Sequence, residues 1–333
     1  MTANQGPIAI EAASSPSTAP SVAQTHRLAV VFSFLSIYFI WGSTYLAIRF
    51  AVETIPPLYT AGFRHLIAGL ILLVWCLAKR LRPTWAQVRA SFIIGVFFFL
   101  IGHGTLHWAE QKVPSGLASL IIASEPLWVF LLTAIAARRL RLNVPLLAGI
   151  LLGFGGVGLL MGRSALHSGP GVFVGSLAVL LGAFSWSVGI VYSRQSHLSG
   201  HPLLLSALSL LAGSVQLLLV GTAFGEYRGF SLASVSVRSW FAIAYLIVFG
   251  SVVAFTAYNW LLEHYSPTLV ATHTYVNPIV AVLFGWLFAA EAVTFNVLLS
   301  AALVISAVML VDRGMTRLQQ RPESQRNEDT RQK

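Results

Sequence analysis

The chain has 333 residues, of which 56% are hydrophobic and only 10% charged, whereas a soluble domain carries about 25% charged residues. So little polar surface cannot coat a chain of this length in water, which excludes a water-soluble globular fold. The net charge of +10 does not indicate nucleic acid, because the basic residues gather in alternate loops between apolar windows. The single cysteine, Cys76, excludes a disulfide framework and a cysteine-based metal site.

Apolar windows long enough to cross about 30 Å of hydrocarbon recur along the chain. Helices are expected in them, because the windows are continuously apolar and a backbone in lipid must satisfy its own hydrogen bonds. The fold class is therefore an all-α integral membrane protein. We expect ten transmembrane helices, at 29–50, 58–78, 91–109, 115–137, 144–162, 171–193, 203–224, 240–262, 267–290 and 294–312.

Both ends of the chain are polar, and we expect disordered tails at 1–27 and 313–333. The first is rich in Ala, Ser, Thr and Pro and lacks the basic start of a signal peptide. Lysine and arginine are concentrated in the loops on the side of the N-terminus, so the positive-inside rule predicts that both termini are cytoplasmic. These residues include Arg27, Lys79, Arg80, Arg82, Arg89, Arg138, Arg139, Arg141, Arg194, Arg313 and Arg317.

The first three spans carry polar or aromatic residues within apolar sequence. Trp41 and Tyr45 lie near the middle of the first, where a cavity wall suits them better than an interfacial belt, although packing through the glycine between them is the simpler alternative. In the second, Arg64 either snorkels to the headgroups, lines a vestibule or pairs with a carboxylate such as Glu53. His103 in the third is a candidate polar contact with a permeating solute, whereas scattered histidines argue against a metal site.

The fourth span holds the strongest functional signal. Glu125 is the sole charged residue between 114 and 137 and is followed by Pro126. A carboxylate at mid-membrane is costly unless it faces a wet cavity, takes a partner or is protonated, so Glu125 is the candidate coupling residue. A protonated glutamate that hydrogen-bonds a neighbouring helix is the structural alternative. Pro126 removes an amide donor and predicts a helix break with Glu125 in extended geometry.

Glycines in the fifth span fit a dinucleotide-binding pattern at 153–158, but no strand precedes them and they lie within an apolar helix. The glycine pairs of Gly149 with Gly153 and of Gly158 with Gly162 instead favour close helix packing, within the bundle or across a dimer.

The second half repeats the plan of the first. Trp186 corresponds to Trp41, and Ser-Pro-Thr at 266–268 corresponds to Val-Pro-Ser at 113–115. Asn277 and Pro278 replace Glu125 and Pro126, so a second helix break is predicted there. We therefore expect two repeats, at 28–163 and 164–312. Because each holds five spans, the copies enter the membrane from opposite sides as inverted repeats, which is the plan of many transporters.

Four segments together resemble the EamA family of the drug/metabolite transporter (DMT) superfamily: Trp-Gly-Ser-Thr-Tyr at 41–45, Ala-Gly-Phe-Arg at 61–64, Val-Pro-Ser-Gly at 113–116 and Tyr-Val-Asn-Pro at 275–278. The resemblance extends over 28–312. It implies a ten-helix bundle of two inverted five-helix repeats in a bacterial inner membrane that exports small metabolites, amino acids among them. Proton coupling through Glu125 is inferred from its position in the membrane and not from the resemblance.

These observations predict a secondary active transporter, not an enzyme, that exports amino acids or similar small metabolites by alternating access with protons as the coupling ion. The alternatives are a passive facilitator, drug efflux, and a membrane enzyme, which would lack a second acid beside Glu125. We expect no cofactor, metal or nucleic acid, the lipid bilayer and a small solute as partners, and a monomer or homodimer. The predicted substrate-binding residues are Trp41, Tyr45, His103, Glu125, Trp186, Tyr258, His273, Tyr275 and Asn277.

Overall fold

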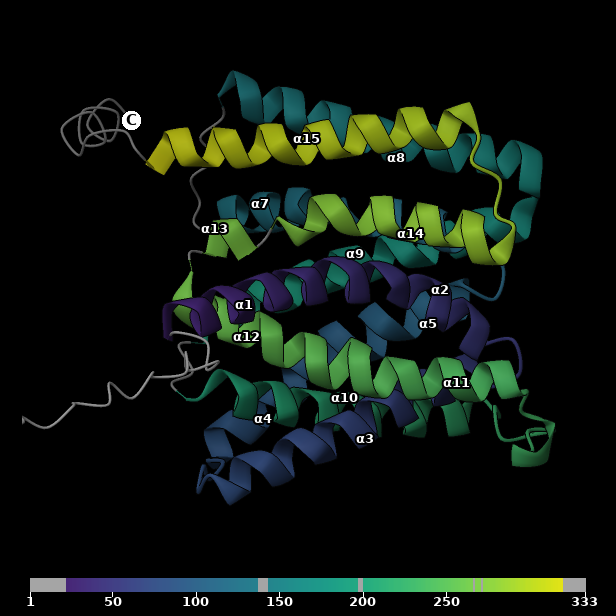
Figure 1. The fold of residues 1–333 in the computed structure, drawn as a ribbon. Coiled ribbons are helices and arrows are strands. Elements are labelled where there is room, and N and C mark those ends of the chain that lie inside the picture. The colour runs from purple at the N-terminus through teal and green to yellow at the C-terminus, as the bar shows by residue number, and fades with distance from the viewer. Residues whose placement is uncertain (1–21, 137–142, 197–199, 266, 271, 320–333) are drawn as a thin grey trace, which may run out of the picture.

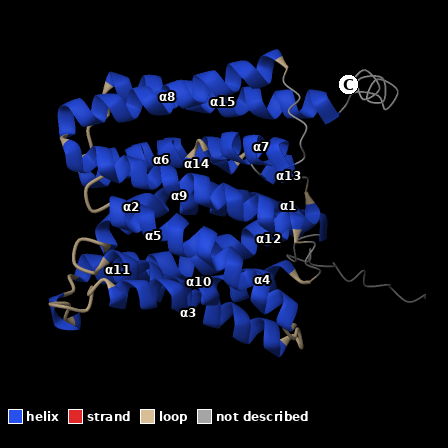
Figure 2. Ribbon diagram, turned by 180° about the vertical axis from the view of Figure 1, so that it is seen from behind, coloured by secondary structure: helices blue, strands red, loops and turns tan. Residues whose placement is uncertain are grey.

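The structure, a computed structural model, describes residues 22–136, 143–196, 200–265, 267–270 and 272–319. Within these residues the secondary structure is helical, and Figure 2 shows the helices joined by loops at the two ends of the bundle. Nine of the helices in the described part of the chain are long and apolar enough to cross a membrane, and His273–Ala289 is a shorter apolar helix. The predicted all-α membrane fold is confirmed.

The first repeat forms five crossings, three of which consist of more than one helical segment. They are α1 (Val22–Leu35), η1 (Ser36–Ile40) and α2 (Trp41–Ala51); α3 (Pro57–Ala78); α4 (Trp85–Gly95), η2 (Val96–His103) and α5 (Gly104–Ala109); α6 (Ser115–Ile122) and α7 (Glu125–Ala136); and α8 (Val144–Ser168). The segments η1 and η2 are π-helical and continue the helices on either side of them.

The second repeat forms the other five crossings in the same order. They are α9 (Pro170–Gln195); α10 (Pro202–Ala223); α11 (Val237–Tyr245), η4 (Leu246–Val253) and α12 (Ala254–His264), preceded by the 3-10 turn η3 (Leu232–Ser234); α13 (Pro267–Val270) and α14 (His273–Ala289); and α15 (Phe295–Gln319). A π-helical segment, η4, thus occupies the third crossing of this repeat, as η2 does in the first. Because each repeat has an odd number of crossings, the second repeat starts on the opposite side of the membrane from the first, and the two repeats are inverted relative to each other.

Helix starts follow from local sequence. Pro57, Pro170 and Pro202 stand in the first turns of α3, α9 and α10, where a missing amide hydrogen costs nothing. Thr84 and Gln87 form a capping box at the start of α4, in which each side chain hydrogen-bonds the backbone amide of the other. These signals mark where α3, α4, α9 and α10 begin.

Corresponding helices of the two repeats pack against each other. Helix α3 contacts α10, α8 contacts α15, and α6 contacts α14. In Figure 1 the α8–α15 pair forms one side of the bundle and α3 with α10 the other, so that α2, α6, α7, α9, α12 and α14 lie between them. Helix α1 begins and α15 ends at the same end of the bundle, on the left of Figure 1, called the termini end below. The opposite end is called the far end.

Glycine permits several of these close contacts. A Cβ on Gly149 would lie 2.8 Å from the backbone oxygen of Ala307, and one on Gly153 would lie 2.3 Å from Leu127 Cδ1. This pair therefore packs α8 against α15 and α7 within the bundle. Gly158 and Gly162 have open space beside them, so they make no such contact with the described residues.

The ends of the chain differ from the prediction. Helix α1 begins at Val22 and α15 continues to Gln319, so parts of both expected tails are helical. Extending α15 past 312 keeps Val311 and Met315 against Leu127, Phe130 and Leu146 in one apolar cluster. The rest of each tail lies outside the described residues.

Candidate functional site

A cavity of about 770 Å³ lies between the two repeats, within the range of about 300–1,000 Å³ of small-molecule sites. Its lining comes from the central helices of both halves. Of the nine predicted substrate-binding residues, the structure brings eight to this lining, together with both prolines: Trp41, Tyr45, His103, Glu125, Pro126, Trp186, Tyr258, His273, Asn277 and Pro278. Tyr275 lies outside it and interacts electrostatically with Asp312 on α15.

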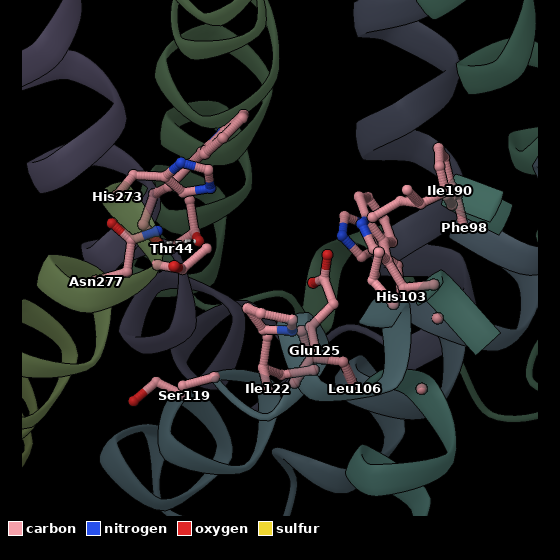
Figure 3. Close-up of a pocket in the computed structure, with 18 of the residues that line it drawn as sticks. Thr44, Phe98, His103, Leu106, Ser119, Ile122, Glu125, Ile190, His273 and Asn277 are labelled. Carbon is pink, nitrogen blue, oxygen red and sulfur yellow. Dashed lines mark hydrogen bonds between the residues drawn. The ribbon is translucent and has the colours of Figure 1, made fainter. Parts of the chain in front are cut away.

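Glu125 stands at the interruption of the fourth crossing. Helix α6 ends at Ile122 and α7 begins at Glu125, and the backbone oxygen of Glu125 accepts a hydrogen bond of 3.2 Å from Ser187 Oγ on α9. Figure 3 shows its carboxyl group directed into the space between His103 on one side and His273 with Asn277 on the other. The break therefore holds an acidic side chain in the middle of the cavity, at the point where the two repeats meet.

The two prolines act differently from the prediction. The chain leaves the helix at Ala123 and Ser124, before Pro126, and Glu125 is helical and not extended. Pro278 lies inside α14, and the interruption of that crossing precedes His273. In the first turn of α7 the proline has no intrahelical amide bond to lose, so the helix tolerates it there.

Aromatic rings form two opposing walls of the cavity. The Trp41 ring centroid lies 5.1 Å from those of Tyr258 and His273, and its Nε1 donates to the backbone oxygen of Gly250 at 3.1 Å. On the other wall Trp186 stacks between Phe98, at 4.3 Å and 20°, and His103, at 5.1 Å and 18°. These flat faces can contact an apolar or aromatic group of a solute on either side of Glu125.

Asn277 ties the two repeats together. In the amide orientation that satisfies both of its polar atoms, its nitrogen donates to the backbone oxygens of Tyr38 at 3.0 Å and of Ile37 and His273 at 3.1 Å. The side chain is 8% exposed. Its amide nitrogen therefore holds α14 against the π-helical segment η1, whose geometry offers these carbonyl groups.

Arg64 is a lining residue whose partner the sequence did not identify. It is 3% exposed, and its Nε donates to Ser251 Oγ on η4 at 3.0 Å. It therefore neither snorkels to the headgroups nor pairs with Glu53, which forms a 3.4 Å ion pair with Arg238. The combination of an arginine one turn inside a span with a serine on a distant one carries no local sequence signal.

The cavity differs at its two ends. Arg194, in the last turn of α9 at the termini end, is an exposed lining residue, whereas the lining residues Ile48, Arg64, Leu106 and Ser119 are buried. At the far end Arg49 pairs with Glu291, which also accepts hydrogen bonds from the backbone of Ser115 and Gly116. The cavity therefore reaches the surface at the termini end and is closed at the far end.

Comparisons with known proteins place this architecture. The sequence pattern of the EamA-like transporter family matches residues 28–162 and 173–312, one match in each half. The chain is 35% identical over 285 residues to the inner membrane transporter YedA of Escherichia coli K12, covering 84% of this chain and 89% of YedA. It is 24% identical over 283 residues to the transporter YoaV of Bacillus subtilis, covering 84% and 96%.

The likeness extends to a plant protein and to a solved structure. A WAT1-related chloroplastic protein of Arabidopsis thaliana is 28% identical over 286 residues, covering 84% of this chain and 68% of its own. A crystal structure of a protein with 22% sequence identity superposes with a TM-score of 0.59 over 88% of this chain and 99% of its own, which establishes likeness of fold. The family pattern matches both halves of the sequence and YedA is 35% identical to it, so the chain belongs to the EamA-like transporter family.

Proposed function

We propose that this protein is a secondary active transporter that exports amino acids or similar small metabolites across the bacterial inner membrane by alternating access. The observation that carries the proposal is the cavity between the repeats, which places one acidic side chain, Glu125, between two aromatic walls. A small amphipathic solute matches such a lining, because rings contact its apolar part and the acid and helix ends meet its polar part.

The orientation of the chain supports export. The excess of lysine and arginine in the loops on the side of the termini favours a cytoplasmic location of both termini. The cavity then opens to the cytoplasm and is closed toward the outside by the Arg49–Glu291 pair. Opening the other side requires that pair to part, and the two repeats would then exchange roles about the central site.

Coupling is assigned to Glu125. The carboxyl is half-buried in the cavity, and none of the described residues donates a hydrogen bond to it, so a proton or a cationic group of a solute can occupy the same place. Competition between the two would link solute release on one side to proton uptake on that side. Only a ligand that differs in affinity between the two states can drive the exchange, which a change of charge at mid-membrane provides.

The proposal is tested in proteoliposomes with an imposed pH gradient and each of the twenty amino acids as a labelled solute or competitor. A coupled exporter accumulates a solute against its gradient, and Glu125→Gln abolishes accumulation while leaving counterflow exchange intact. Glu53→Gln, which changes an acid in an exposed ion pair outside the cavity, is the matched control and behaves as the parent.

Three results would contradict parts of this proposal. Equilibration of the solute without accumulation in the parent protein identifies a passive facilitator. Accumulation that survives in Glu125→Gln assigns coupling to another residue. Failure of all twenty amino acids to be transported or to compete excludes this class of substrate.

A further inference from the structure

The far side of the cavity ends against a cluster of titratable side chains from two crossings of the first repeat. Arg64 and His65 come from α3, and His103, His107 and Glu110 lie along the third crossing and just beyond it. Of these, Arg64 and His103 line the cavity. His65, His107 and Glu110, which are 0%, 0% and 1% exposed, lie behind them. The cluster is separate from Glu125, and its members behind Arg64 and His103 do not line the cavity.

Direct contacts connect the histidines. His103 Nδ1 lies 2.7 Å from His65 Nε2, so one of the two rings donates a hydrogen bond to the other. His107 Nδ1 donates to the backbone oxygen of His103 at 2.7 Å, which fixes that tautomer. The His107 ring centroid lies 6.5 Å from that of His65 and 5.8 Å from that of His103.

Several buried polar atoms of the cluster have no hydrogen-bond partner among the described residues. They are His65 Nδ1, His107 Nε2 and Arg64 Nη1, whereas the Glu110 carboxyl lies near the backbone amide of Arg49. Buried polar atoms in native proteins are almost always paired, and a group of unpaired ones in one place points to a function in ligand or proton exchange. Here the unpaired atoms belong to neighbouring side chains, of which His65 and His107 can gain or lose a proton.

The cluster continues to the far end. Glu110 interacts electrostatically with Arg49, Arg64 and Glu291, and also with Tyr45. His65 and His103 interact with Arg64 and with each other's rings. Arg49, whose side chain is 33% exposed, belongs to the far-end ion pair. Titratable and charged groups therefore extend from the cavity to the far end through the half of the bundle that is closed to a solute.

We propose that His65, His103, His107 and Glu110 form a proton relay that connects the far end with the cavity while the solute path is closed there. The inference rests on the proposed proton-coupled transport, and it adds a site of protonation besides Glu125. Within the described residues no three metal-ligating side chains converge on a point that could hold an ion, so the pairwise contacts suit a proton and not a metal.

The transfer balances one proton in and one proton out. Glu110 exchanges a proton with the far end and with Nε2 of His107, its neighbour one helical turn away. Nε2 of His107 then gives that proton up toward Nδ1 of His65, and Nε2–H of His65 passes its own proton to Nδ1 of His103. His103 then releases the proton on its Nε2 toward the cavity and Glu125. Return of the histidine tautomers to their starting form completes the step.

The relay is tested on the full-length protein labelled with ¹⁵N-histidine in lipid bilayers, with the proton as the ligand. The expected result is that the signals of His65, His103 and His107, assigned by single substitutions, change protonation or tautomer together as the pH is varied. Glu110→Gln is expected to displace the His107 titration midpoint by about one pH unit. Glu53→Gln is the matched control and leaves it in place, since Glu53 lies in an exposed ion pair.

Transport assays complete the test. In the pH-gradient assay with amino acids, Glu110→Gln and His107→Gln are expected to lower accumulation about tenfold with counterflow retained, whereas His201→Asn, which keeps an acceptor at the start of α10, leaves it unchanged. Histidines that keep one tautomer throughout the titration in every variant overturn the relay, and so does full accumulation in both relay variants. Absence of pH-driven transport in the parent protein contradicts the proposed function instead, and the titration then still decides whether the cluster exchanges protons.

Discussion

Arg49 of α2 and Glu291, which follows α14, form an ion pair that joins the first and second repeats at the far end. The Glu291 carboxylate also accepts hydrogen bonds from Ser115 N at 2.8 Å, Ser115 Oγ at 2.9 Å and Gly116 N at 3.1 Å, all at the start of α6. Its side chain is 8% exposed. One carboxylate thus holds three crossings together, because the amide groups at a helix start attract an anion.

Glu291→Gln is expected to open the far end. A hydrogen bond to a charged group contributes about 1.5–3 kcal/mol, and 1.4 kcal/mol corresponds to a tenfold change in a population. With Cys76 replaced by serine and Leu106→Cys as reporter on the buried cavity lining, labelling by an impermeant maleimide from the far side is expected to rise about tenfold. Glu53→Gln serves as control, and unchanged labelling in Glu291→Gln contradicts a gating role for the pair.

Trp186→Ala is expected to weaken competition by solutes with an aromatic side chain. Trp186 stacks on Phe98 and His103, and its removal takes a flat face from the cavity wall. The concentration of phenylalanine needed for half-inhibition of flux should rise about tenfold, whereas Trp186→Phe should stay near the parent. Competition by glycine is the internal control, since it has no side chain to stack. An equal loss for both solutes would indicate general damage to the cavity.

Gly213→Ala is expected to destabilise the bundle. A Cβ at this position of α10 would lie 2.3 Å from Phe99 Cβ on η2, a contact that a side chain cannot make without movement of a helix. Overpacking of this kind costs about 1–3 kcal/mol, and it should lower the midpoint of thermal unfolding in detergent. Gly158→Ala is the matched control, because nothing lies within 4 Å of its Cβ and alanine favours helix. Equal midpoints for the two variants would refute the packing argument.

Glu226 should give the unfolding midpoint a dependence on pH. It lies between α10 and α11, outside the spans, and accepts hydrogen bonds from Leu58 N at 3.1 Å and Tyr59 N at 3.0 Å. Burial raises the pKa of its carboxyl above 4.5 and outweighs the two hydrogen bonds, which act in the opposite direction. Between 4.5 and the raised pKa the folded protein binds more protons than the unfolded chain, so stability falls as pH rises.

Glu226→Gln removes this titration. Thermal unfolding of the parent, measured from pH 4.5 upward, should show a midpoint that decreases through the window and then levels off, and the variant should lose this component. A slope of the same size in both proteins would assign the pH dependence to another group.

The candidate site was largely accessible to sequence reasoning. Glu125 and His103 stood out because a polar residue in a membrane span is costly, and Trp41 and Trp186 because they lie at mid-span and not at an interface. Each of these signals is local, and each of these residues lines the cavity. Their role in binding a solute stays a prediction.

Other features could not be predicted, because they depend on which helices meet. Glu291 follows its helix like any surface acid, and only the packing of α2, α6 and α14 brings it to Arg49 and Ser115. Tyr275 lies between the lining residues Thr274 and Asn277 in the sequence, but the rotation of α14 leaves it outside the cavity lining. The interruption before His273 was not predicted at its place either, since proline was expected to mark it and Pro278 is accommodated within the helix.

The amino-acid sequence alone determined the class, the ten crossings and the two-repeat plan, because exclusion of apolar residues from water acts on each segment separately. Tertiary structure alone decided that the cavity opens at the termini end, that one ion pair closes the other, and that the histidines lie in contact. Those outcomes depend on distances between side chains far apart in the chain, and packing of the two repeats against each other sets those distances.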